Sequence, residues 1–124
     1  KIIMKLYIEK ESQIEGIKKL FTAFYPFLKI EFYKKPLRAN NSFAKKEAIP
    51  QQMALMQFAA MPGRKGIDIS QDRTVKDLEN DFESVGLFAE VLRKSGNVWI
   101  ETSLTNDWTL QQQNLEGEEI THGL

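Results

Sequence analysis

The feature that most constrains the fold is a hydrophobic pattern that occurs twice along the chain. Five apolar positions in residues 6–21 have apolar counterparts in residues 67–82 at a constant offset of 61: Leu6, Ile8, Ile14, Ile17 and Phe21 match Ile67, Ile69, Val75, Leu78 and Phe82. In each segment, apolar residues first alternate with polar ones and then recur every three or four residues. This change of period is typical of a β-strand followed by an amphipathic helix.

A second strand follows each predicted helix. Residues 28–35 and 87–94 correspond at an offset of 59, and each places apolar side chains on one face: Leu28, Ile30 and Phe32, then Leu87, Ala89 and Val91. Pro26 and Gly86 end the two helices. The spacings Ser12-x-x-Glu15 and Thr74-x-x-Asp77 resemble capping boxes at the helix starts. Each half of the chain therefore predicts a β-α-β unit.

Two β-α-β units in series predict an α+β protein, a ferredoxin-like sandwich in which an antiparallel sheet carries two helices on one face. The length of 124 residues suits one domain. Within residues 1–124 we expect a first unit at 1–35, an insertion at 36–65, a second unit with an added strand at 66–104, and a C-terminal helix and tail at 105–124. In the insertion, residues 50–61 predict a short helix.

The added strand and the final helix follow from local signals. Ser95-Gly96-Asn97 predicts a tight turn into a fifth strand at 98–104, on which Val98 and Ile100 point inward. Residues 107–114 predict a short helix. Its cap is expected at Thr105, Asn106 or Asp107, with fraying beyond Glu116.

Composition excludes several classes of function. Seventeen basic residues balance 17 acidic ones, which argues against a generally polycationic binder. The absence of cysteine excludes disulfides, thiolate metal sites and cysteine nucleophiles, and a single histidine, His122, leaves no basis for histidine metal clusters or Ser–His–Asp triads. We therefore predict no catalytic residue, no metal and no cofactor. No apolar run approaches the length of a membrane span, and we expect a cytoplasmic protein.

Three blocks carry a resemblance to known sequences. They are Pro26-Phe-Leu-Lys-Ile-Glu-Phe32, Arg93-Lys-Ser-Gly-Asn-Val-Trp-Ile-Glu-Thr102, and Asp107-Trp-Thr-Leu110 with Gln113-Asn114. In these blocks the chain resembles an uncharacterised family of small bacterial proteins of similar length. The resemblance implies a small cytoplasmic protein, and it implies no activity.

Aromatic side chains are predicted on the face of the sheet away from the helices. Alternation points Tyr7, Tyr33, Phe88 and Trp99 outward among lysines such as Lys94. An Asp-Trp-Thr start to the last helix places the ring of Trp108 back across the sheet, beside Trp99 or Phe88. This ring is interpreted first as structural packing and alternatively as an anchor for a partner. The candidate binding residues are therefore Tyr7, Tyr33, Phe88, Lys94, Trp99 and Trp108. The competing interpretation is that the final helix, the insertion or a second subunit covers these rings.

Three functions are compatible with these residues. The leading hypothesis is a small non-catalytic protein-interaction module, with self-association through the sheet face or the fifth, edge strand. The alternative is a single-stranded nucleic-acid binder that stacks bases on the aromatic face. The third is a small-ligand carrier or enzyme, which needs a pocket holding Tyr33 and a carboxylate of shifted pKa.

Overall fold

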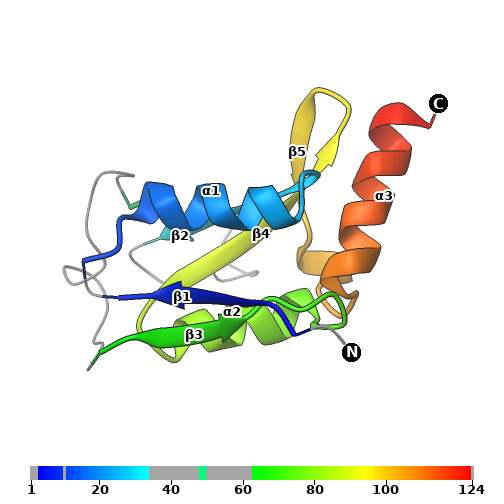
Figure 1. Ribbon diagram of the computed structural model, residues 1–124. Helices are drawn as coiled ribbons and strands as arrows, with labels where there is room; N and C mark the ends of the chain where they lie inside the picture. Colours follow the sequence, from blue (N-terminus) through cyan, green and yellow to red (C-terminus); the bar gives the residue numbers. More distant parts are fainter. Residues whose placement is uncertain (1–2, 10, 34–47, 50–62, 124) are drawn as a thin grey trace.

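The computed structural model describes residues 3–9, 11–33, 48–49 and 63–123 (Figure 1). Along the chain the elements are β1 (Lys5–Ile8), α1 (Ile14–Phe24), β2 (Leu28–Tyr33), β3 (Lys65–Asp68), α2 (Val75–Glu83), β4 (Phe88–Ser95), β5 (Val98–Glu101), a 3-10 turn at Ser103–Thr105 and α3 (Leu110–His122). The α+β class, the strand–helix–strand order of each half and the added strand are confirmed. The helix expected at 50–61 lies outside the described residues.

The strands form two antiparallel sheets. β1 pairs with β3, and β2, β4 and β5 form a second sheet in that order. Equivalent strands of the two units thus pair with each other: Leu6 lies opposite Ile67, and Ile30 lies opposite Val91. This differs from the single sheet with helices on one face that the sequence suggested. All four strands carry similar apolar alternation, so this pattern specifies which face is buried and leaves the choice of partner strand open.

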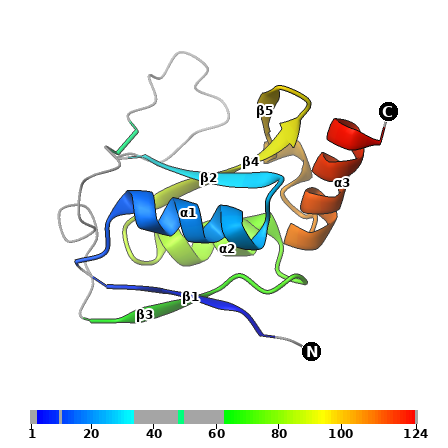
Figure 2. The same cartoon turned by 45° about the horizontal axis from the view of Figure 1, so that its top comes forward.

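Each helix bridges the two sheets. α1 packs against β1 and β2, while α2 packs against β3 and β4. Figure 2 shows both helices between the β1–β3 pair and the larger sheet. The core between these elements includes every apolar position of the 61-residue repeat. Phe32 and Phe82 join the two units through an edge-to-face contact, with ring centroids 5.0 Å apart.

One of the two predicted helix caps is present. The Thr74 side chain accepts a hydrogen bond of 3.1 Å from the backbone N–H of Asp77 at the start of α2. The Ser12 cap is wrong, because α1 begins after Gln13, whose side chain makes no cap bond. Ser12 instead accepts from the N–H of Glu9 at 2.9 Å and stabilises the turn before the helix.

The last helix is longer than predicted. α3 begins after Thr109, which forms a capping box with Gln112, and it continues to His122. The expected cap at 105–107 and the expected fraying beyond Glu116 are therefore wrong. Tertiary packing accounts for the extra turns, because Gly117 lies against Phe27 and the His122 and Phe27 rings form a T-shaped contact with their centroids 5.4 Å apart.

The β4–β5 hairpin projects at the end of the molecule near α3 (Figure 1). Its two-residue turn places Gly96 at a φ of +65°, a conformation that favours glycine. The predicted inward position of Val98 is wrong, because its side chain is 59% exposed. At the other edge of this sheet, the N–H of Ile49 donates to the Phe32 carbonyl at 2.9 Å, and the Ile49 side chain is buried.

Candidate functional site

Four of the six predicted binding residues share one face of the β2–β4–β5 sheet. Tyr33 lies directly opposite Phe88, and Lys94 lies directly opposite Trp99. Residues opposite each other in an antiparallel pair point to the same side. We call this side the outer face of the large sheet; the register also places on it Lys29, Glu31, Glu90, Leu92 and Glu101.

The outer face is a partly covered surface and not an open aromatic platform. Tyr33 is 9% exposed, and its hydroxyl donates to Glu90 Oε1 at 3.2 Å. Phe88 and Trp99 are half-buried, and Lys29 Nζ lies 5.1 Å from the centre of the Trp99 ring. The outward direction predicted for Tyr33 is therefore correct, but its ring is buried, in line with the competing interpretation that these rings are covered. Ala48, which bridges to Tyr33, belongs to the insertion, and sequence periodicity gave no information about how that segment approaches the sheet.

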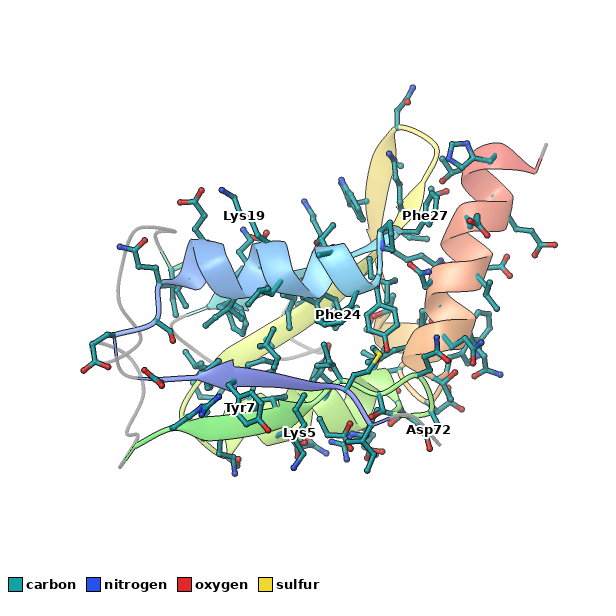
Figure 3. The ribbon with its side chains drawn as sticks, viewed as in Figure 1. Lys5, Tyr7, Lys19, Phe24, Phe27 and Asp72 are labelled. Carbon is teal, nitrogen blue, oxygen red and sulfur yellow. The ribbon has the colours of Figure 1, made fainter. Side chains whose placement is uncertain are left out.

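Tyr7 belongs to a different surface. It lies on the solvent side of the β1–β3 pair, opposite Gly66, and is 51% exposed (Figure 3). The guanidinium carbon of Arg64 lies 4.1 Å from the centre of its ring. The prediction that Tyr7 and Trp99 face away from the core is correct, but the two rings lie on separate sheets and not on one shared face.

Trp108 lies on the opposite side of the large sheet from Trp99. Its ring packs near the Arg93 guanidinium, whose central carbon is 5.6 Å from the ring centre. Arg93 is next to Lys94 on β4 and therefore points the other way. Arg93 also donates to Gln113 Oε1 at 2.8 Å, and the buried Gln113 donates to the Thr105 carbonyl at 2.8 Å. Trp108 is thus part of the α3 packing, and the predicted pairing with Trp99 or Phe88 is wrong.

Glu79 is a residue of chemical interest that the sequence analysis missed. It corresponds to Lys18 at the 61-residue offset, while Glu90 corresponds to Glu31 at the offset of 59. Lys18 Nζ forms an ion pair with Glu31 at 2.6 Å, whereas Glu79 Oε2 accepts from the Val91 N–H at 3.2 Å. Burial raises the pKa of Glu79 to about 7; the Val91 hydrogen bond opposes the shift and the charge of Glu90 adds to it. The sequence did contain a signal for this residue, because the 61-residue offset aligns the Glu79 carboxylate with the Lys18 ammonium group.

The clearest difference between the two units lies on the solvent side of their helices. On α1, four exposed residues form an apolar stripe at helical spacing: Gly16, Leu20, Ala23 and Phe24. Leu20 is 51% exposed and Phe24 is 47% exposed. Figure 3 shows Lys19 and Phe24 pointing to opposite sides of α1, with Phe24 on the side of β1. We call these four residues the α1 stripe.

The equivalent positions of α2 are mostly polar. Gly16, Leu20 and Ala23 correspond to Asp77, Asp81 and Ser84, while the counterpart of Phe24 is the buried Val85. Asp81 pairs with Arg73, and Asp77 lies in the first turn of α2, where a carboxylate interacts favourably with the helix dipole. The fold therefore does not require apolar residues on this side of a helix, and the α1 stripe needs another explanation.

Comparison with known proteins provides no independent assignment: no family model, curated protein or solved structure matches the chain. Among the described residues, no group of three histidine, cysteine or acidic side chains is placed to hold a metal ion. Within that same part of the chain, every helix is too short or too polar to cross a bilayer.

Proposed function

We propose that this protein is a small interaction module that docks another protein surface against the α1 stripe. The observation that carries the proposal is the contrast between the helices: α1 and α2 bury the same pattern, yet only α1 exposes large apolar side chains on its solvent side. Exposed leucine and phenylalanine side chains in a contiguous stripe favour burial, at roughly 25 cal/mol for each Å² of apolar area removed from water.

The nucleic-acid hypothesis has less support from the side chains. A stacking platform needs several exposed ring faces and an excess of positive charge. On the outer face of the large sheet, Tyr33 is buried, and Glu31, Glu90 and Glu101 oppose the charges of Lys29 and Lys94. Trp99 and Phe88 remain the rings through which a base would stack if the hypothesis were correct.

The enzyme or ligand-carrier hypothesis gains one feature, a cluster of three ionisable side chains. The Glu79 carboxyl lies near Glu90, which accepts a hydrogen bond from the Tyr33 hydroxyl. A carboxyl group that titrates near pH 7 is suited to proton transfer. The Glu79 carboxylate, however, already accepts a hydrogen bond from the Val91 N–H, at the point where β5 no longer pairs with β4. This hydrogen bond stabilises the fold. We therefore rank this hypothesis below docking.

Three finer statements belong with the proposal. The β-α-β order and the antiparallel β1–β3 pair support a ferredoxin-like relationship, while the separate β2–β4–β5 sheet counts against it. The cytoplasmic location expected from the sequence stays a prediction. The resemblance to small bacterial proteins supports a similar small module.

Affinity capture with matched variants tests the proposal. Tagged wild-type protein, Leu20→Asp and the α2 control Asn80→Asp are used as baits in native lysate, with and without nuclease. We expect a stoichiometric protein that survives nuclease, is lost with Leu20→Asp and is retained with Asn80→Asp. Equal recovery with both variants would reject the α1 stripe. Species that disappear with nuclease would support nucleic-acid binding instead.

A further inference from the structure

The α1 stripe is self-complementary. On that basis we propose that its partner is a second copy of this chain, with the two α1 helices packed antiparallel about a two-fold axis at Leu20. This inference rests on the proposed docking function and names its partner. A two-fold interface brings the same surface of both copies together, so each feature of the stripe must fit another feature of the same stripe.

The shapes of the side chains fit this arrangement. Gly16 and Phe24 lie four residues before and after Leu20, which places each about 6 Å from Leu20 along the helix. An antiparallel copy centred on Leu20 therefore brings Phe24 of one chain over Gly16 of the other, twice. A Cβ atom added at Gly16 would meet nothing within 4 Å, so this position is open to an incoming ring. The small side chain of the exposed Ala23 leaves room beside Leu20 for a second helix to approach.

The charges also fit an antiparallel pair. α1 has Glu15 in its first turn and no basic residue in its last turn, so the helix itself supplies no side chain that neutralises its negative C-terminal end. An antiparallel copy brings the positive N-terminal end of the second α1 beside it. The exposed cation that precedes Leu20 in the sequence, Lys19, points to the other side of α1 from Phe24 (Figure 3) and pairs with Glu15 at 2.9 Å, which limits repulsion between the two copies.

The size of the contact sets the expected affinity. α1 has 11 residues, about 16 Å of helix, so the helix pair buries less than the roughly 800 Å² per partner of a standard interface. We therefore expect a weak dimer, with a dissociation constant from roughly 10 µM to 1 mM. At such affinities the copy number in solution depends on protein concentration.

Disulfide trapping provides the first test. The chain contains no cysteine, so Leu20→Cys introduces a single thiol at the proposed axis. Related by the axis, two such side chains come within the roughly 4 Å between Cβ atoms that a disulfide needs. We expect rapid oxidation of Leu20→Cys to a covalent dimer and slow oxidation of Asn80→Cys, the control on α2. Equal rates for the two variants would overturn the inference.

A second test distinguishes specific packing of the two helices from nonspecific hydrophobic association. Gly16→Leu enlarges the apolar stripe but fills the position reserved for Phe24 of the partner, and the open space around Gly16 allows the monomer to fold. Sedimentation velocity over a concentration series should show dimerisation weakened at least about tenfold, with an unchanged circular dichroism spectrum. Stronger or unchanged association would refute the antiparallel geometry. If the wild-type chain stays monomeric while Leu20→Asp still loses a captured protein, self-pairing fails and the docking surface stands.

Discussion

The two β-α-β units bury nearly the same side chains and expose different ones. Ile14, Ile17 and Phe21 of α1 occupy the positions that Val75, Leu78 and Phe82 occupy in α2. On the solvent side, Leu20 corresponds to Asp81. Burial in a shared core imposes the inner pattern on both helices, because any other choice leaves a cavity or a buried polar group. The outer side carries no such constraint, so the two helices can differ there, and the proposed docking function rests on this difference.

The same comparison holds where each helix meets the large sheet. In the first unit, Lys18 neutralises Glu31, whereas in the second unit Glu79 lies near Glu90. Glu31 and Glu90 themselves lie directly opposite each other on β2 and β4. Nearly equivalent positions thus produce an ion pair in one unit and a carboxyl group of raised pKa in the other. Similar backbones therefore do not imply similar electrostatics.

The largest expected effect tests whether the inner faces are equivalent. Phe21→Ala and Phe82→Ala each remove a fully buried ring, and each should lower the free energy of unfolding by about 3–5 kcal/mol. Urea denaturation followed by tryptophan fluorescence measures both values. A difference of several kcal/mol between the variants would show that the two units do not share the core equally.

Gly117→Ala tests the packing of α3, a helix without a counterpart in the first half of the chain, against Phe27 and Arg93. A Cβ atom at this position of α3 would lie 2.9 Å from Phe27 Cβ and 3.1 Å from the Phe27 carbonyl oxygen, so one element must shift. We expect the free energy of unfolding, measured by thermal denaturation, to fall by about 2 kcal/mol, although alanine has a better helix propensity than glycine. An increase in stability would mean that α3 does not approach β2 this closely.

Glu79→Gln tests the electrostatic difference between the units. The folded pKa of about 7 lies above the reference value of 4.5, so the stability linked to protonated Glu79 is full below pH 4.5 and is lost as the pH rises through 7. Glutamine remains neutral and can still accept from Val91. After allowance for partial solvent screening, we expect the variant to be more stable than the wild type by about 1 kcal/mol at pH 8.

The control for this prediction is to compare the stability of the wild type and Glu79→Gln at low pH. Below pH 4.5 the two proteins should unfold at the same denaturant concentration, because the Glu79 carboxyl is then neutral in both the folded and the unfolded wild type. A constant difference from pH 4 to pH 8 would indicate that the substitution acts through packing and not through ionisation.

The smallest effect concerns the outer side of α1. Gly16→Ala adds a methyl group where nothing lies within 4 Å, and alanine has the higher helix propensity. In dilute protein we expect a gain of about 0.5–1 kcal/mol, opposite in sign to the same substitution at Gly117. A destabilised Gly16→Ala at low concentration would contradict the open environment described for this position.

The predicted site was only partly recoverable from the sequence. Alternation correctly placed Phe88, Lys94 and Trp99 on one face, because the side of a strand follows from a period of two. It did not reveal that Tyr33 is buried, that Trp108 packs beside Arg93 on the opposite face, or that Tyr7 belongs to another sheet. Those facts depend on contacts between residues far apart in the chain.

By itself, the sequence determined the α+β class, the strand–helix–strand order of each half and the buried positions of the repeat, since each follows from local periodicity. Tertiary structure decided which strands pair, how far α3 extends and what Glu79 contacts. The reason is physical: periodicity fixes which face of an element is apolar, while partner choice and pKa depend on the energies of groups brought together only by folding. Identifying the α1 stripe required both the sequence and the tertiary structure. The sequence shows that its residues are apolar, and only the fold shows that they are exposed.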